Sequence, residues 1–478
     1  MKFDGWQLLN YQRFPFRRLY LLDRSKLNYF VWEIKMSTLG IINPDSAGID
    51  VGSEFHYVCV PDGRADPRVR NFACFTNDLN RLADWLTECR VNSVAMESTG
   101  VYWIPLYEIL TARGFEVTLA NAKYVKNVPG RKTDVQDCAW LQQLHSYGLL
   151  QGSFIPGQLI SELRGYMRQR VNLVKGAAAH VQRMQKSLTQ MNLQLHKVIS
   201  DITGETGLKI IGAILDGERN PLKLAQLRSG RIHKGEEAIA QALVGNYRAD
   251  HLFSLRQEHD LYLHYQTKIA ECDKQVLEHY AKFESKDKSL DNEAKPETVE
   301  AGGNAKSKES PKFNLRRELQ RITGVDFTKI PGLDVLSIQS IIAETGLDPS
   351  KWPTEKHFSS WLGLSPANKI TGGKVYSTRT RKVNSRAATV FRTAAVGAGK
   401  SKTALGAFYR RLKSRSGAMS AITATARKLA CMFYSLLKNG NEYVEKGMTE
   451  YEDRYHDRVV KNLTRRAKEL GLSLVHAT

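Results

Sequence analysis

The sequence lacks paired cysteines and long apolar runs. Its six cysteines are scattered singly, and they form neither a CxxC pair nor a Cys/His cluster at the spacing of zinc ligands. This argues against a disulfide framework or a zinc finger and predicts reduced, partly buried thiols. No apolar run approaches the ~20 residues that a membrane-spanning helix needs, and the first residues lack the features of a signal peptide. We therefore expect a cytoplasmic protein with no membrane partner.

Acidic residues are missing from one long stretch. Between Lys356 and Asn441 the sequence contains no Asp or Glu but seventeen Lys or Arg, and the whole chain has 70 Lys and Arg against 49 Asp and Glu. A solvated structural face normally mixes charges of both signs, whereas this excess attracts polyanions such as nucleic acid. The stretch therefore predicts a nucleic-acid contact surface, with an ordinary basic surface as the alternative. The expected contacts are Lys369, Lys374, Arg379, Arg381, Lys382 and Arg386.

A chain of 478 residues exceeds what one hydrophobic core usually serves, so several domains are expected. Changes in composition and periodicity predict an N-terminal extension (1–36), an α/β domain (37–155), a helical coiled-coil region (156–283), a disordered linker (284–312), a mainly α-helical domain (313–445) and a basic helical tail (446–478). The extension is aromatic and basic without clear periodicity, and we assign it no chemistry. An upstream extension, a nucleic-acid-binding arm and a segment that docks on a partner subunit are all open alternatives for it.

The α/β domain is expected from alternating strand and helix patterns. The segment AGIDVGSEFHYVCVPDG combines an apolar run, a Gly break, an alternating run and an Asp-Gly turn, which predicts a β-hairpin. A helix around TNDLNRLADWLTECR, a strand at VNSVAMES, a helix through YWIPLYEILTARG and a strand at FEVTLANA follow. This alternation is typical of an α/β layer fold.

The next region changes to a helical period. Apolar residues step by three and four, as in the seam of a coiled coil, at Val174, Ala177, Val181, Met184, Leu188, Met191, Leu195 and Val198. A second helical run could supply the partner within the chain through Leu261, Tyr265, Ile269, Cys272 and Val276. Pairing within one chain and pairing between subunits are equal alternatives at this point.

Two further segments precede the acid-free stretch. Residues 284–312 are charged and almost without large apolar groups, which predicts disorder. The segment ITGVDFTKIPGLDVLSIQSIIAETG then has the helix, Pro-Gly turn and helix of a helix-hairpin-helix, whose turn presents backbone N–H groups to phosphate.

Four carboxylates in the α/β domain are candidate metal ligands. Asp50 lies in the middle of an apolar strand, where a charge is costly unless it is paired or binds a cation. Glu97 ends another strand, and Asp134 and Asp137 share one face at the start of a predicted helix. Such oxygen ligands suit Mg²⁺ or Mn²⁺. The alternatives are a helix N-cap for Glu97, a capping role for Asp134 with Asp137 in the first turn, and a hairpin hydrogen bond for Asp50.

Several segments together resemble a known family. The strings GIDVG, MESTGVYWIPLYEIL, LANAKYVKNVPGRKTDVQDCAWL, IPGLDVLSIQSIIAETG, FSSWLGLSPANKITGGK and AITATARKLACMFYSLL are similar, in matching order, to the DEDD transposases of the insertion-sequence 110 family. These enzymes are relatives of the Piv invertase, and the chain looks closest to the 1111-type subgroup. The resemblance covers roughly residues 47–155 and 325–440.

The resemblance implies a fold, a cofactor and partners. It implies an N-terminal RuvC-like, RNase H-like domain whose Asp, Glu, Asp, Asp tetrad binds Mg²⁺ at Asp50, Glu97, Asp134 and Asp137. A coiled-coil segment would link this domain to a mainly α-helical transposase domain with a helix-hairpin-helix-like entry. Dimers to tetramers assembled with a noncoding bridge RNA would recombine donor and target DNA in a nucleoid-associated, cytoplasmic setting.

The family's nucleophilic serine aligns with Thr371. Its hydroxyl stands before the Gly372-Gly373 pair in NKITGGKVYSTRTRK, and a threonine hydroxyl can attack phosphorus once it loses its proton. Ser377 is the alternative nucleophile and Ser365 a third candidate. The structural alternative is that Thr371 only orders the glycine turn.

These observations predict an RNA-guided DNA recombinase of an insertion sequence. One alternative is a RuvC-like nuclease that hydrolyses branched DNA through the four carboxylates. Another is a degenerate transposase that only binds nucleic acid. A covalent protein–DNA adduct would separate the recombinase from both alternatives, because a hydrolytic nuclease forms none.

Overall fold

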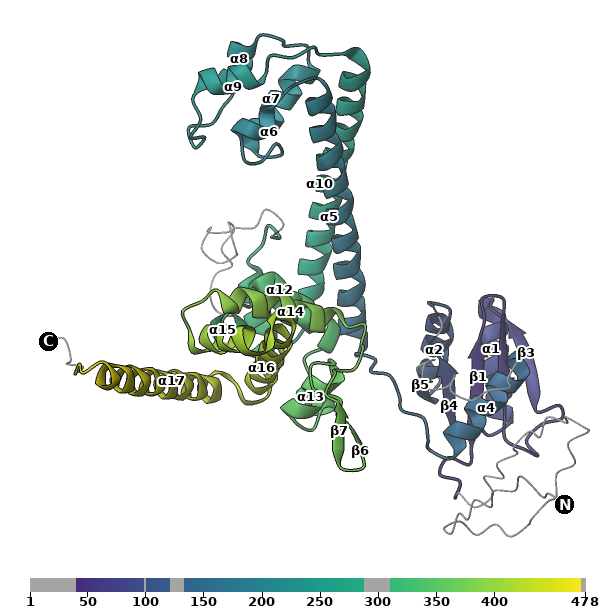
Figure 1. The fold of residues 1–478 in the computed structure, drawn as a ribbon. Helices are drawn as coiled ribbons and strands as arrows, with labels where there is room; N and C mark the ends of the chain where they lie inside the picture. The colour runs from purple at the N-terminus through teal and green to yellow at the C-terminus, as the bar shows by residue number, and fades with distance from the viewer. Residues whose placement is uncertain (1–39, 99, 121–132, 288–309, 474–478) are drawn as a thin grey trace, which may run out of the picture. The chain divides into compact units, whose positions relative to one another are not determined.

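The computed structural model describes residues 40–98, 100–120, 133–287 and 310–473 (Figure 1). The predicted N-terminal extension and most of the predicted linker lie outside these residues. By its internal contacts the chain divides into two compact units, residues 1–154 and 155–478. Among the described parts, the first unit is α/β with a mixed sheet and the second is mainly helical. None of the described helices is long and apolar enough to cross a membrane.

The first unit is built on a five-stranded sheet. In spatial order its strands are β3 (Val69–Ala73), β2 (Phe55–Cys59), β1 (Ser46–Val51), β4 (Ser93–Glu97) and β5 (Glu116–Ala120). Strands β1 and β2 form the predicted antiparallel hairpin, whereas β4 pairs parallel with both β1 and β5. Strand β3 was not predicted from the sequence, because its five residues include exposed Arg70 and Asn71 and show no clear alternation.

Helices accompany both the centre and the edges of this sheet. Helix α1 (Thr76–Glu88) contacts β3, α2 (Trp103–Ala112) contacts β5, and α4 (Asp134–Ser146) packs on the central strand β1. On β1 and β4 the side chains of Ile49 and Met96 have no exposed surface. Strands that are covered on both faces read as continuous apolar runs, which is why these two were recognisable in the sequence.

The second unit begins with two long helices that lie side by side, α5 (Gln158–Gln190) and α10 (Ala249–Tyr280) (Figure 1). Between them Arg170 Nε lies 2.5 Å from the Asp273 carboxylate, and both residues are buried. His180 Nδ1 lies 2.5 Å from a carboxylate oxygen of Glu258 in the same interface. The two periodic runs therefore pack against each other within one chain.

The predicted seam is wrong at its end and at one position of its partner. Helix α5 ends at Gln190, and Asn192 has a φ of 57°, a left-handed conformation that does not continue a helix. The chain re-forms a short helix only at α6 (Leu195–Val198). On α10, Leu261 is 42% exposed, and it is the neighbouring Tyr262 that is buried.

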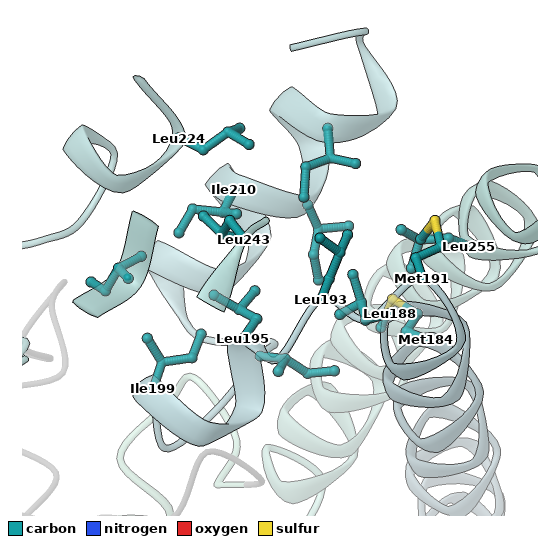
Figure 2. Packing of buried hydrophobic residues seen from close by; sticks show 14 of the residues in the cluster. Met184, Leu188, Met191, Leu193, Leu195, Ile199, Ile210, Leu224, Leu243 and Leu255 are labelled. Carbon is teal, nitrogen blue, oxygen red and sulfur yellow. The ribbon is translucent and has the colours of Figure 1, made fainter. Parts of the chain in front are cut away.

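A small group of helices caps one end of the α5–α10 pair. Besides α6 it contains α7 (Glu205–Leu215), α8 (Pro221–Gln226) and α9 (Glu236–Ala242). Figure 2 shows the buried apolar cluster that joins this cap to the pair, with Met184 and Leu188 from α5 and Leu255 from α10. Leu195 and Ile210 contribute from the cap. The apolar period of α5 is thus satisfied by this intrachain core.

One end of the predicted disordered linker is ordered. The backbone N–H of Lys286 donates to the carbonyl oxygen of Arg321 at 2.8 Å. The Arg321 side chain in turn donates to the carbonyl oxygen of Phe283 at 3.0 Å. Residues 284–287 therefore belong to the folded unit, because they hydrogen-bond to the helix that begins the next region.

That region is helical except for one hairpin. Its elements are α11 (Leu315–Thr323), η2 (Phe327–Lys329), α12 (Val335–Thr345), η3 (Pro349–Lys351), α13 (Glu355–Trp361), β6 (Lys369–Thr371), β7 (Lys374–Ser377), α14 (Arg386–Gly399), α15 (Ala404–Ser416), α16 (Ala418–Asn439) and α17 (Asn441–Glu469). Helices α14, α15 and α16 pack on one another. The buried rings of Phe327 and Phe433 stack with their centroids 4.4 Å apart. Helices α11 and α12 flank the turn at Gly332, whose φ is 91°.

Candidate active site

Two of the four candidate carboxylates lie on neighbouring parallel strands. The register of β1 and β4 places Ile49 opposite Met96, so Asp50 and Glu97 follow as the next residues of the two strands. Alternate residues of a strand face the same side of a sheet, and Asp50 and Glu97 therefore face the same side as Gly48. Glu97 is buried with 7% of its surface exposed, and Asp50 is half-buried.

Helix α4 brings the other two carboxylates to the same end of the sheet. The Gln142 amide donates to the carbonyl oxygen of Ser46 at the start of β1. The negative charge of Asp50, near the end of β1, acts on Cys138, one turn earlier in the helix. Helix α4 therefore runs antiparallel to β1, and its first turn, which contains Asp134 and Asp137, lies towards the strand ends of Asp50 and Glu97.

Two cysteines lie in the tightly packed contact between helix α4 and the sheet. The side chains of Cys59 on β2 and Cys138 on α4 hydrogen-bond to each other. The pKa of the Cys138 thiol is raised by this hydrogen bond, by burial and by the negative charges of Cys59 and Asp50. The same hydrogen bond lowers the pKa of Cys59 to about 7. Both are fully buried free thiols, so they act as core residues.

Gly48 allows α4 to approach β1 this closely. A Cβ at this position would lie 2.2 Å from the Gln142 nitrogen and 2.3 Å from the Cys138 carbonyl oxygen. We expect Gly48→Ala to push α4 away from β1 and to destabilise the first unit by about 1–3 kcal/mol, the usual cost of overpacking. Thermal unfolding followed by circular dichroism measures this.

Gly40→Ala is the matched control, because nothing lies within 4 Å of a Cβ at Gly40. A Gly48→Ala protein that unfolds at the same temperature as the Gly40→Ala protein would show that the contact between α4 and β1 is not tight.

The donor chemistry of this end of the sheet fits a divalent cation. Asp50, Glu97, Asp134 and Asp137 offer only hard carboxylate oxygens, which Mg²⁺ and Mn²⁺ prefer. The first turn of α4 is the positive end of the helix dipole, which stabilises the charges of Asp134 and Asp137 without attracting a cation. Within the described residues, however, no three His, Cys, Asp or Glu side chains are close enough together to hold a metal ion. The backbone thus brings Asp50, Glu97, Asp134 and Asp137 to the same end of the sheet, but in the described residues their side chains are not close enough together to coordinate one cation.

The candidate nucleophile Thr371 lies in a β-hairpin of the second unit. It ends β6, and the loop to β7 is the pair Gly372-Gly373, whose φ angles are 54° and 75°. Positive φ at both loop residues is the requirement of a type I′ turn, which favours glycine. Thr371 is directly opposite Lys374, and both side chains are exposed. The hydroxyl is therefore accessible, and a lysine ammonium is its cross-strand neighbour.

The two other candidate hydroxyls are less accessible. Ser377 is half-buried and its oxygen accepts a hydrogen bond from the Arg379 N–H at 3.3 Å. Ser365 shares a 3.1 Å hydrogen bond with Ser359, a residue with no exposed surface. Thr371 is the most exposed of the three, and this favours it over the alternatives.

The basic residues predicted to contact nucleic acid lie on and beside this hairpin. Lys369 and Lys374 are on its strands, whereas Arg379, Arg381, Lys382 and Arg386 follow it, and all six are exposed. Arg381 also donates to the Ser360 carbonyl oxygen at 2.6 Å, so it helps to hold the base of the hairpin.

An open pocket of about 510 Å³ lies next to this base. Its lining is Thr380, Arg381, Lys382, Val383, Asn384 and Arg392. Arg392 was not among the residues predicted from the sequence, because only the fold brings α14 to the residues that follow the hairpin. Its place in the acid-free stretch was the one available signal.

Comparison with known families agrees with the layout of both regions. Residues 47–193 match the transposase family model of the DEDD IS110 type. Residues 326–410 match the model of the transposase IS116/IS110/IS902 family. The first match contains the four carboxylates, and the second contains the hairpin with Thr371. No curated protein matches the chain. The two matched domains support a DNA transposase or recombinase enzyme.

Proposed function

We propose that this transposase is a recombinase of an insertion sequence that cuts and rejoins donor and target DNA strands with a hydroxyl nucleophile. The observation that carries the proposal is the pairing of two matched transposase domains with two candidate centres. One centre is the carboxylate region at the sheet end of β1 and β4, and the other is the accessible Thr371 on its basic hairpin.

The reaction needs one hydroxyl and one group of carboxylates. Thr371 Oγ forms a bond to the scissile phosphorus and gives its proton to solvent, while the bond from phosphorus to the leaving deoxyribose oxygen breaks and that oxygen takes a proton from solvent. The exposed Lys374 beside Thr371 places positive charge near the phosphate oxygens. Because the resulting phosphoester keeps the bond energy, a second DNA end can reverse the step and complete strand exchange.

Asp50, Glu97, Asp134 and Asp137 would hold Mg²⁺ or Mn²⁺. When bound, such a cation supplies positive charge that favours ionisation of a hydroxyl and offsets charge on a departing oxygen. The support is the shared face of Asp50 and Glu97, and the start of α4 at the same sheet end. The strand order, in which β3, β2 and β1 pair antiparallel in turn and β4 and β5 run parallel to β1, also supports a RuvC-like fold for this unit.

The proposed recombinase also binds a noncoding guide RNA and acts as an oligomer of two to four copies of the chain. The acid-free stretch supports an RNA partner as well as a DNA partner, since contacts to phosphate do not require a particular sequence. Recombination joins four DNA ends, so more than one copy of Thr371 is needed in one assembly. The setting that follows is cytoplasmic and nucleoid-associated.

A nucleic-acid-binding protein without catalysis is a second candidate. Threonine stands where the resemblance places a nucleophilic serine, and its extra methyl group crowds the approach to phosphorus. The described residues also show no closed group of metal ligands. Incubation of the protein with labelled DNA, followed by a denaturing gel, separates the two functions, because only the recombinase leaves a covalent adduct.

The basic surface leads to a prediction about salt. Changing Arg379 and Lys382 together to Ala removes two exposed cations without touching the hydrogen bond of Arg381 to Ser360. If both cations contact phosphate, the slope of log affinity against log salt should become shallower by about 2. Fluorescence anisotropy with labelled DNA at several salt concentrations measures the slope.

Changing Lys268 and Lys274 on α10 to Ala is the matched control, since it removes the same charge from exposed positions outside the acid-free stretch. Equal slopes for the two double variants would place the nucleic-acid surface elsewhere.

A further inference from the structure

The β6–β7 hairpin exposes apolar side chains that an ordinary surface turn would cover. Ile370 is 62% exposed, Val375 57% and Tyr376 84%. A two-stranded hairpin is marginally stable in water by itself. Here its base is fixed by a bridge between Pro366 and Thr380 and by a 3.0 Å hydrogen bond from the Ala367 N–H to the Arg379 carbonyl. The base of the hairpin is therefore held by hydrogen bonds, while the apolar side chains of its two strands stay exposed to solvent.

A β-bulge determines the position of Tyr376. Lys369 pairs with Ser377 and Ile370 pairs with Val375, so Tyr376 is an extra residue without an opposite partner. Bulges of this kind redirect a side chain and are common beside active sites. The bulge lies five residues from Thr371 in sequence and on the strand that pairs with it. The exposed ring of Tyr376 thus lies on β7 two residues beyond Lys374, the residue that pairs with Thr371.

The charges around Tyr376 indicate what covers it. Lys369 and Lys374 on the two strands and Arg379 just beyond β7 are exposed charged residues close to it in the sequence and register, and the stretch from Lys356 to Asn441 contains no acidic residue. An apolar protein surface would have to accept this uncompensated positive charge. A nucleic acid satisfies both features, because its phosphates pair with the cations and its bases offer flat faces to an aromatic ring.

We propose that the β6–β7 hairpin binds an unpaired stretch of DNA, with Tyr376 stacking on a base next to the phosphate that Thr371 attacks. The inference rests on the proposed function, because it takes Thr371 as the point of attack. A base face is available only where the two strands have separated, and strand exchange requires such separation. Tyr376 is then a positioning residue that holds the separated strand while Thr371 reacts.

The test measures binding in the full chain with Thr371→Ala, so that no adduct forms. The probes are a short oligothymidine strand, a strand of abasic nucleotides of equal length and a duplex of equal length, each followed by fluorescence anisotropy. We expect Tyr376→Ala to weaken binding to oligothymidine about tenfold, the effect of losing one stacked base. Binding to the abasic strand should hardly change. Tyr376→Phe should keep the affinity, and the salt slope should stay the same, because no charge is lost.

Phe253→Ala is the matched control, since Phe253 is an aromatic residue 66% exposed at the start of α10. Equal oligothymidine affinities for Tyr376→Ala and Phe253→Ala would overturn the proposal. A loss by Tyr376→Ala that is as large on the abasic strand, or larger on the duplex, would overturn it as well, because stacking on an unpaired base would not be its cause. Failure of the proposed function is a separate result: wild type would then form no adduct, whatever Tyr376 does in these binding assays.

Discussion

Replacing Thr371 with Ala should abolish the covalent protein–DNA adduct while nucleic-acid binding is kept. Thr371 is exposed at the end of β6, so the substitution removes the hydroxyl without opening a cavity. Loss of a nucleophile cannot be replaced by its neighbours, and we expect at least about a thousandfold slower strand transfer. Denaturing gels of labelled DNA measure the adduct, and anisotropy measures binding.

Two variants make the result specific to this hydroxyl. Thr371→Ser should keep the adduct and form it faster, because loss of the methyl group opens the line of attack on phosphorus. Ser377→Ala should leave the adduct unchanged, although it removes the acceptor of the Arg379 N–H. If the adduct forms in Thr371→Ala but not in Ser377→Ala, the nucleophile is Ser377 and not Thr371. If the wild-type protein forms no adduct, the recombinase is excluded, and the two remaining functions are a non-catalytic nucleic-acid-binding protein and a hydrolytic nuclease.

The sheet and its acidic positions could be predicted because local patterns determine them. The apolar runs around Asp50 and Glu97 belong to strands covered on both faces, and the helix that starts at Asp134 has a threonine N-cap. The sequence did not predict the distances between the four carboxylate side chains. Whether four carboxylates close on a cation depends on side-chain conformations and on the helix–sheet separation, and in the described residues they form no closed group.

The helical region shows a different limit of sequence analysis. A period of three and four residues reports that one face of a helix is buried, but it does not say what buries it. The apolar face of α5 continues in the sequence through Met191 to Val198, while the backbone turns at Asn192. Leu188 and Leu195 consequently meet in one intrachain core from two different helices. Assembly of subunits through this region stays a prediction.

The hairpin was only partly recognisable for a similar reason. The Gly372-Gly373 pair is a strong turn signal, whereas Thr371 was selected as the nucleophile because it aligns with the serine of the family that the sequence resembles. The exposure of Tyr376 follows from the bulge between two short strands, which no period of so few residues can reveal. The pocket beside the hairpin likewise needs Arg392 from α14, ten residues beyond Lys382 in the sequence.

Asp134→Asn should abolish strand cleavage if the four carboxylates share a cation. Asp134 is exposed in the first turn of α4, so the neutral amide should preserve the packing of the helix on β1. Strand cleavage should fall by at least about a hundredfold, the upper end of the loss found even for residues that only support metal ligands. Asp50→Asn, Glu97→Gln and Asp137→Asn should behave alike, because removing any one ligand weakens the site that the others share.

Asp78→Asn is the matched control for that loss, because Asp78 also lies in the first turn of a helix of the same unit, α1, where it forms an ion pair with its helix neighbour Arg81. Isothermal titration of Mn²⁺ gives a readout that does not depend on DNA cleavage: the Asp78→Asn protein should bind the ion as wild type does, and the Asp134→Asn protein should bind it more weakly. Both substitutions remove a favourable interaction with a helix N-terminus, and Asp78→Asn also removes the ion pair with Arg81. A loss of Mn²⁺ affinity in Asp134→Asn alone therefore indicates a cation bound at Asp134. Normal recombination by Asp134→Asn with Mg²⁺ as the sole divalent ion would show that the four carboxylates do not share one cation.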